Sequence, residues 1–307
     1  MEIKENFSSK GEGLPILPAP LVNWKGAVVL RDTEVGEIER MTVREDDIWV
    51  CSVPRSGTTL TQEMVYLIQT NLNFEMARNK QLDERFSFLD LYLPKYEYFR
   101  GVKYIESSPS PRFIKSHLHT HLLPESLFKS NCKIIYVMRN PKDVAVSTYH
   151  HQKYFKQLKP EDGFETFCND WIEGKVYASP WWRHVKDFWK LHGRENVLFL
   201  KYEDLVKDMD EAVIKIARFF GKTLTDEQVS QIVNHCQFDK MKANQCVNGT
   251  WIERYRQVNE EHGSRVRKGK VGEWRNYFTP ELNKKMDDMV KEHLGDLDLT
   301  LDYGDGQ

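Results

Sequence analysis

Short apolar runs alternate along the chain with stretches in which apolar residues recur every three or four positions. The apolar runs have the length and side chains of buried strands and cover residues 47–53, 112–116, 133–138 and 196–202. The amphipathic stretches predict helices over residues 58–70, 139–155, 179–192, 209–221, 225–236 and 280–294. Such alternation is typical of βαβ units, so we expect an α/β fold with a central parallel sheet flanked by helices on both faces.

The helix expected after residue 138 has the clearest start signal. Asn140 is a suitable N-cap, and Pro141 stands at the first helical position, where its missing N–H is tolerated. The chain of 307 residues has no internal repeat and no boundary in composition. We therefore expect a single domain over residues 1–307 with flexible ends at 1–20 and 296–307.

Composition narrows the class of protein. A formal net charge of -2 with 29% charged residues fits a soluble globular protein and argues against a general nucleic-acid coat, which needs an excess of Lys and Arg. The five scattered cysteines form no C-x-x-C pair, so we expect reduced thiols and a cytoplasmic location. No run approaches the ~18 apolar residues that suggest a membrane span. Neither a nucleic acid nor a membrane is expected as a partner.

In parallel sheets, ligands bind beyond the carboxyl ends of the strands. The first such place is "CSVPRSGTTL", residues 51–60, which predicts a P-loop-like turn whose backbone N–H groups converge beside a helix N-terminus. Gly57 allows the tight curl, and Thr58 and Thr59 add hydroxyl donors. A Walker A loop would carry Lys after Gly57, whereas here the basic residue is Arg55, before the glycine. The alternative is a simple turn whose hydroxyls only cap the helix.

Lys115 and His117 close the second strand, and a period of two places them on one side of the chain. The imidazole can accept a proton from a hydroxyl, and Lys115 can stabilise negative charge on a transferred group. His119 and His121 continue the alternation, but no acidic or Cys partner lies at a useful spacing, so no metal is expected. The alternative for His117 is a capping or solvated residue at a strand end.

Two further basic segments suit an anion. Arg139 follows the third strand, and with Ser147, about two turns into the next helix, it suits a phosphate monoester. The alternative for Arg139 is a weak surface ion pair with Asp143. A flexible cationic segment that could close over an anion, or could be only a solvated face, contains Arg265, Arg267, Lys268, Gly269 and Lys270.

Together and in this order, these motifs closely resemble the cytosolic sulfotransferase family over residues 46–274. "PRSGTT" resembles the family's 5′-phosphosulfate loop, "RNPKDVAVS" its 3′-phosphate motif, and "RKGKVGEW" the segment that covers the nucleotide. The resemblance implies transfer of a sulfuryl group from 3′-phosphoadenosine 5′-phosphosulfate (PAPS) to a hydroxyl or amine of a small acceptor, leaving adenosine 3′,5′-bisphosphate (PAP). It implies no metal, and sulfation of phenols as in xenobiotic metabolism and detoxification.

The resemblance also implies roles for individual residues. His117 is implied as the general base, with Lys115, Arg55 and Ser147 as the other catalytic residues. The implied donor-binding residues are Arg55, Ser56, Gly57, Thr58, Thr59, Leu60, Arg139, Ser147, Tyr202, Cys236, Phe238, Arg267, Lys268 and Gly269. The candidates for the acceptor pocket are Trp24, Phe86, Phe88, Lys115, His117, Tyr149 and His151.

Four of these positions depart from the family pattern. Arg55 replaces the usual lysine, and Leu60 stands where relatives commonly have a tryptophan that stacks on adenine. Cys236 stands where a hydroxyl residue is common. His151 replaces a phenylalanine of phenol-sulfating relatives, which indicates a more polar acceptor. The family's C-terminal dimerisation pattern is poorly matched by residues 275–284, so the sequence leaves a homodimer open without supporting it.

Three other functions compete with this interpretation. The first is an ATP-dependent small-molecule kinase, which the missing lysine after Gly57 argues against. The second is a catalytically idle homologue that binds a small molecule, which the intact Lys115 and His117 argue against. The third is a specialised branch in which sulfate is eliminated after transfer, so that the net reaction is dehydration of an alcohol.

Overall fold

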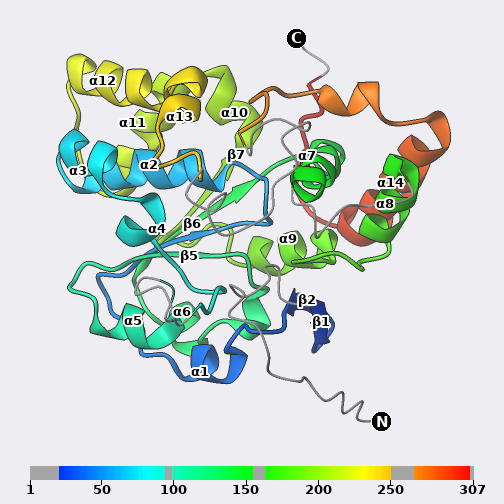
Figure 1. Cartoon of the computed structure of the whole chain (residues 1–307), viewed down its shortest axis with the longest axis horizontal. Coiled ribbons are helices and arrows are strands. Elements are labelled where there is room, and N and C mark those ends of the chain that lie inside the picture. Colours follow the sequence, from blue (N-terminus) through cyan, green and yellow to red (C-terminus); the bar gives the residue numbers. More distant parts are fainter. Residues whose placement is uncertain (1–20, 94–98, 100, 155–162, 250–265, 305–307) are drawn as a thin grey trace, which may run out of the picture.

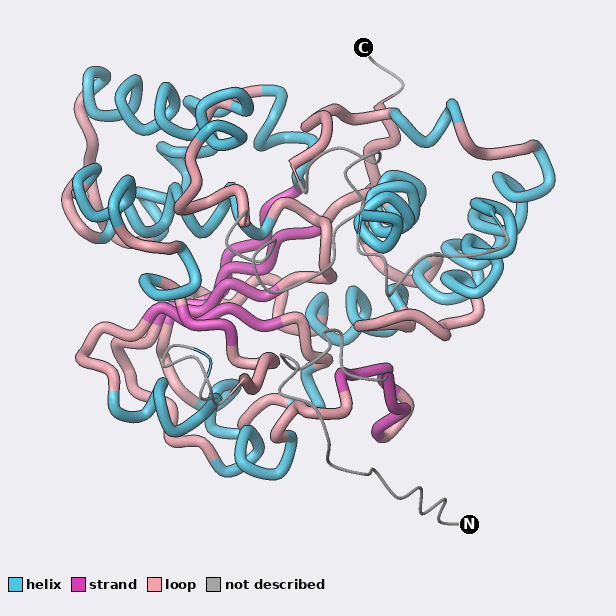
Figure 2. The backbone as a smooth tube through the Cα atoms, in the orientation of Figure 1, coloured by secondary structure: helices cyan, strands magenta, loops and turns pink. Residues whose placement is uncertain are grey.

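A computed structural model of the chain describes residues 21–93, 99, 101–154, 163–249 and 266–304 (Figure 1). Its centre is a five-stranded parallel sheet enclosed by helices, as the backbone trace also shows (Figure 2). The strands lie side by side in the order β4 (Ser87–Phe88), β5 (Phe113–Ser116), β3 (Ile48–Cys51), β6 (Lys133–Met138) and β7 (Val197–Lys201). The predicted α/β class and the four predicted strands are confirmed.

Alternate residues of each central strand point to opposite faces of the sheet, so each face has its own core. In β3, Trp49 and Cys51 belong to what we call the first core, while Ile48 and Val50 belong to the second core. All four residues are at most 4% exposed. Because both faces are apolar, helices cover both, which is why the strands appear as continuous apolar runs in the sequence.

Figure 1 shows the two groups of helices on either side of the sheet. The first core is covered by α1 (Val35–Arg40), α5 (Gly101–Ser107), α6 (Glu125–Lys129), α7 (Pro141–Tyr154), α8 (Gly163–Ile172), α9 (Trp181–Trp189) and α14 (Pro280–Leu294). The second core is covered by α2 (Thr58–Gln69), α3 (Phe74–Asn79), α4 (Leu82–Arg85), α10 (Tyr202–Lys207), α11 (Met209–Phe219), α12 (Asp226–Cys236) and α13 (Phe238–Ala243). The six predicted helices are confirmed; the others lacked a sequence signal, most because they are too short for one.

The predicted helix start at Asn140 is confirmed by its side chain. Its Oδ1 accepts a hydrogen bond of 2.8 Å from the backbone N–H of Asp143, and α7 begins at Pro141. Thr225 caps α12 through a capping box with Gln228. These local contacts explain why the sequence placed both helix starts correctly.

Two features at the ends of the described chain add to the expectations from the sequence. An antiparallel hairpin of β1 (Leu21–Trp24) and β2 (Ala27–Leu30) had no strand signal strong enough to predict. At the other end, within the stretch 296–304 that was expected to be flexible, Leu297, Leu299 and Leu301 pack against the first core. The expected flexible ends at 1–20 and 305–307 lie outside the described residues, and the single domain stays a prediction.

Two remaining expectations concern cysteines and the membrane. All five cysteines are free thiols, and only Cys246 is more than slightly exposed. Within the described ranges, no helix combines the length and apolar character that crossing a bilayer requires.

Candidate functional site

The loop between β3 and α2 has an unusual backbone. Gly57 has φ +100° and Arg55 has φ +72°, a left-handed conformation that is uncommon for a non-glycine residue. A Cβ at Gly57 would lie 2.6 Å from the ring of Tyr202. The Ser56 hydroxyl is buried and has no hydrogen-bond partner among the described residues. The loop therefore leaves polar groups unsatisfied at the carboxyl edge of the sheet.

A cavity of about 360 Å³ lies at this edge, where β5, β3 and β6 are neighbours. Among its lining residues are all the predicted catalytic residues, namely Arg55, Lys115, His117 and Ser147, and all the predicted donor-site residues except Ser56. The donor-site residues come from three strand ends, from α7, α12 and α13, and from the segment 266–270. The structure thus brings together residues that lie as far apart in the sequence as positions 55 and 269.

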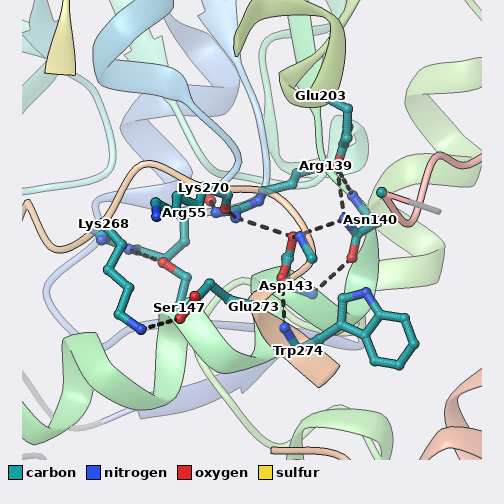
Figure 3. Close-up of polar contacts among 12 residues, drawn as sticks. Arg55, Arg139, Asn140, Asp143, Ser147, Glu203, Lys268, Lys270, Glu273 and Trp274 are labelled. Atoms are coloured by element: carbon teal, nitrogen blue, oxygen red, sulfur yellow. Dashed lines mark hydrogen bonds and ion pairs between the residues drawn. The ribbon is translucent and has the colours of Figure 1, made fainter. Parts of the chain in front are cut away.

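Arg139 is the central cation of this site (Figure 3). It donates hydrogen bonds to the carbonyl oxygens of Lys270 at 2.8 Å and Arg55 at 3.4 Å, and it lies over the ring of Tyr202 at 4.4 Å. Its pair with Asp143, at 3.3 Å, is buried rather than on the surface, because the Asp143 side chain is fully buried. The Nε atom of Arg139 is buried without a partner among the described residues, so the guanidinium keeps donor capacity for a ligand.

Asp143 fastens the C-terminal cationic segment to the start of α7. Its two carboxylate oxygens accept hydrogen bonds from backbone N–H groups, one from Gly272 at 2.8 Å. The other comes from Trp274 at 3.0 Å, as Figure 3 shows. Asn140, three residues earlier, donates a hydrogen bond from its side chain to the carboxylate of Glu203. Burial raises the pKa of Glu203, although the hydrogen bonds from Asn140 act to lower it. Asp143 therefore has a structural role that the sequence pattern alone did not indicate.

The cationic segment itself holds two basic side chains and a glycine against the cavity. Arg267 and Lys268 both pair with Glu273; although burial acts to raise the pKa of Glu273, the hydrogen bonds from Lys268 and Arg267 lower it overall. Gly269 has φ +66°, and a Cβ there would lie 2.4 Å from the Phe238 ring. Arg265 of the same predicted segment lies outside the described residues.

The basic residue of the loop is already engaged with α7. Arg55 Nε donates a hydrogen bond of 3.1 Å to the hydroxyl of Ser147. The contact places the permanently charged guanidinium group of Arg55 beside the Ser147 hydroxyl, and both residues line the cavity.

The contacts of His117 define its tautomer. Its Nδ1 lies 2.8 Å from the carbonyl oxygen of Ser52, which can only accept, so Nδ1 carries the hydrogen and Nε2 is the basic nitrogen. The Ser52 hydroxyl also contacts Nδ1, at 3.2 Å, and Thr58, at 2.7 Å, which ties the ring to the anion loop. The imidazole is thus oriented with Nε2 as its proton-accepting nitrogen.

Asp90, which the sequence did not single out, anchors the end of β5. Its carboxyl group accepts hydrogen bonds from Ser116 Oγ at 2.6 Å, His117 N at 2.7 Å and Tyr177 OH at 3.0 Å. Burial raises the pKa of Asp90 to about 6, although these hydrogen bonds act in the opposite direction. No sequence signal identified it, because its partners come from distant segments.

The rest of the cavity is largely apolar. Leu21, Leu30, Leu91, Leu93, Phe88 and Phe99 line it, together with His151 and Tyr177. Of the predicted acceptor residues, Phe88 and His151 are therefore present beside Lys115 and His117. The Leu side chains come from the hairpin and the loop after β4, which have no motif from which this position could be predicted.

Three predicted acceptor residues do not line the cavity. Phe86 is fully buried and packs on Phe113 at 5.4 Å, because it is the C-cap of α4 and precedes β4. Tyr149 packs between Phe164 and Phe167 in the first core. Trp24 is 46% exposed on β1. Their positions in the sequence could not show that Phe88 lines the cavity and that these three residues do not, because this depends on the direction in which each side chain points.

The histidines that follow His117 are packed against aromatic neighbours. His119 lies 4.9 Å from the His184 ring, and burial lowers its pKa to about 4. Across the described part of the chain, no group of three or more His, Cys, Asp or Glu residues is arranged to hold a metal ion.

Comparison with known proteins was made for the sequence and for the fold. The family description "Sulfotransferase domain" matches residues 45–298. Sulfotransferase 1C2 of Oryctolagus cuniculus is 35% identical over 284 residues, which cover 92% of this chain and 91% of the relative.

Solved structures give the same result. Retinol dehydratase in complex with retinol and PAP has a TM-score of 0.84 and 32% identity, covering 93% of both chains. The same protein has also been solved with androsterone and the inactive cofactor PAP, with a TM-score of 0.84. Mouse sulfotransferase SULT7A1 complexed with PAP has a TM-score of 0.71 and 26% identity, covering 91% of this chain and 96% of that chain.

Proposed function

This chain belongs to the sulfotransferase family, and within that family we propose an enzyme that takes its sulfuryl group from PAPS and passes it to a hydroxyl or amine of a small acceptor. One observation carries the proposal. A single cavity joins the anion loop, the cations Arg55 and Arg139, and the imidazole of His117 beside an apolar chamber.

The donor end of the cavity fits an adenosine carrying two anionic groups. Arg139, whose buried Nε has no partner among the described residues, lines this end, and the Ser56 hydroxyl, likewise unpartnered, lies in the adjoining loop outside the lining. Arg267 and Lys268 supply further cations, and Phe238 and Tyr202 supply rings for the base. Glycine at 57 and 269 leaves room where a Cβ would clash. Structures of similar proteins hold PAP, which supports this choice of donor.

The chemistry follows from the positions of three side chains. When bound, PAPS supplies the sulfuryl group: the bond from sulfur to the phosphate oxygen breaks as the acceptor oxygen bonds to sulfur. His117 Nε2 receives the proton of the acceptor hydroxyl, because Nδ1 is committed to the Ser52 carbonyl. Arg55 and Lys115 stabilise the charge on the departing phosphate and the sulfuryl oxygens. The arginine cannot lose its proton, so it acts by charge and hydrogen bonding alone.

The acceptor end favours a hydroxylated compound with an apolar body. Its wall of Leu21, Leu30, Leu91, Leu93 and Phe99 gives apolar contact, and His117 lines the same cavity. A phenol fits this description, and so does an alcohol with an aliphatic body. A metal requirement is no part of the proposal, because cationic side chains occupy the positions facing the anions. A cytoplasmic location is proposed with it, in keeping with the free thiols.

A second candidate is elimination of sulfate after transfer, which dehydrates an alcohol. The likeness to a retinol dehydratase solved with retinol, together with the apolar wall, favours testing it. Mass spectrometry of the organic product separates the two reactions, because the first leaves a sulfate ester and the second leaves an alkene and free sulfate.

The proposal is tested by incubating radiolabelled PAPS with phenols, steroids, amines and retinoids, using wild type and His117→Ala. We expect label transfer by the wild type, unchanged by EDTA, and a loss of at least ~10²-fold in turnover for the variant, as for removal of a general base. PAP affinity should stay within a few-fold. His192→Ala is the control, since His192 stacks on Trp189 away from the cavity. Phosphorylation of an acceptor from ATP without sulfation, or full turnover by His117→Ala, would contradict the proposal.

A further inference from the structure

Asp83 is the single carboxylate in the described lining of the catalytic cavity. It stands in the first turn of α4, and its side chain is 10% exposed. The other charged residues of the described lining, apart from the histidines, are Arg55, Lys115, Arg139, Arg267, Lys268 and Lys270. A buried acid in a cavity built for anions needs a specific reason, because a buried charge that is poorly paired destabilises the protein.

The contacts of Asp83 are incomplete. Its Oδ1 lies 3.5 Å from Lys115 Nζ, at the outer limit of a hydrogen bond. Its Oδ2 makes no hydrogen bond to the described residues and is not fully buried, and Asp83 is one of the residues that line the cavity. The ring of Phe88 lies under Lys115 Nζ at 3.8 Å, so the ammonium of Lys115 is shared between the carboxylate and this aromatic face.

We propose that Asp83 is a specificity-determining residue that binds a protonated amine of the acceptor, away from the hydroxyl that receives the sulfuryl group. The inference rests on the proposed function and names the substrate class of the same cavity. The acceptor is then a hydroxylated amine whose apolar body lies along the leucine wall and whose ammonium group reaches the carboxylate of Asp83.

The charge balance of the reaction supports this assignment. In the proposed reaction, the ammonium group of Lys115 stabilises the negative charge of the sulfuryl group. While it does so, it neutralises the charge of the Asp83 carboxylate less well. A neutral acceptor would leave the carboxylate poorly paired inside the protein, whereas an ammonium group would restore its pairing. Asp83 therefore discriminates between acceptors that differ only in a positive charge.

The test compares tyramine with 4-ethylphenol, which has the same phenol and lacks the amine. We expect wild type to have the higher kcat/KM for tyramine. In Asp83→Asn, kcat/KM for tyramine should fall about 10-fold or more, as for loss of a charge-assisted hydrogen bond, and kcat/KM for 4-ethylphenol should change little. Glu84→Gln is the matched control, because the neighbouring Glu84 pairs with Lys80 at 3.9 Å and does not line the cavity.

Binding measurements keep the test decisive. Calorimetric titration of tyramine into the PAP complex should show binding to wild type and weaker binding to Asp83→Asn, whatever the turnover. An equal loss for both phenols would overturn the inference, because Asp83 would then only position Lys115. The inference would also be overturned if wild type and Asp83→Asn had the same ratio of kcat/KM for tyramine to kcat/KM for 4-ethylphenol, or if tyramine did not bind to wild type. Failure of the proposed function is distinct, since neither PAP binding nor any sulfated product would then be found.

Discussion

At the scale of single residues, two buried groups beside His117 act in different ways. The Ser52 carbonyl selects the Nδ1–H tautomer, so the proton-accepting nitrogen is chosen by a backbone atom that no substitution removes. Asp90 holds the backbone N–H of the same residue and the hydroxyl of Ser116. One contact therefore orients the ring, and the other fixes the strand end that carries it.

The raised pKa of Asp90 predicts a pH-dependent contribution to stability. Its pKa is about 6 in the folded protein and 3.8 in an unperturbed group, so the folded state binds the proton more tightly. The contribution is fully present below pH ~4 and is lost as the pH rises through ~6, with a slope of up to about 1.4 kcal/mol per pH unit. Urea unfolding of wild type and Asp90→Asn across this window measures the difference in slope.

The control for this experiment is Asp288→Asn, because the Asp288 side chain is 60% exposed and pairs only with Lys284 among the described residues. The control should keep the wild-type slope. If Asp90→Asn kept it too, the carboxyl of Asp90 would not be the titrating group.

At the scale of elements, the segment 266–274 is held by α7 and by the end of β6 through its backbone between Lys270 and Trp274. Asp143 binds the backbone of Gly272 and Trp274, and Arg139 binds the carbonyl of Lys270. On the cavity side, Gly269 lies against the Phe238 ring of α13. The segment thus joins the start of α7 to the wall where we propose that the adenine lies.

Substitution of Gly269 should separate packing from backbone strain. Gly269→Ala adds a Cβ 2.4 Å from the Phe238 ring at φ +66°. Gly221→Ala has nearly the same backbone, φ +68°, with nothing within 4 Å. Gly221→Ala should lose about 1 kcal/mol of stability from backbone strain alone, and Gly269→Ala should lose more because of the contact with Phe238. Only Gly269→Ala should bind PAP at least ~10-fold more weakly. Equal PAP affinities in calorimetry would contradict a donor site at this wall.

At the scale of the whole molecule, residues from both ends of the described chain cover the same sheet. Leu297, Leu299 and Leu301 pack on the first core, and the carbonyl of Tyr303 accepts a hydrogen bond of 3.1 Å from Trp274 Nε1. Tyr303 also lies under Lys142 of α7 at 4.5 Å. The C-terminal residues therefore support the cationic segment from outside.

Truncation tests this support. Ending the chain after Gly295 removes the three leucines and Tyr303, and we expect the free energy of unfolding to fall by about 3 kcal/mol or more. Ending it after Gly304 keeps all of these contacts and should change stability by less than about 0.5 kcal/mol. Urea unfolding gives both values. Equal stability of the two truncated chains would show that residues 296–304 contribute no packing energy.

The sequence by itself determined the elements and the chemistry of the donor end. Some features depend only on residues a few positions apart, so the sequence alone predicts them. They are the alternation of strands and helices, the helix start at Asn140 and the loop at 51–60. Because parallel strands expose their carboxyl ends at one edge, the sequence also placed Lys115, His117 and Arg139 near one another.

Tertiary structure alone decided the acceptor end. Whether Phe86 or Phe88 faces the cavity depends on where α4 stops, and the leucine wall comes from a hairpin with no motif. Asp83 and Asp90 meet Lys115 and His117 only across the folded sheet. Such contacts join residues far apart in the sequence, and their energies come from burial and pairing that no local pattern encodes.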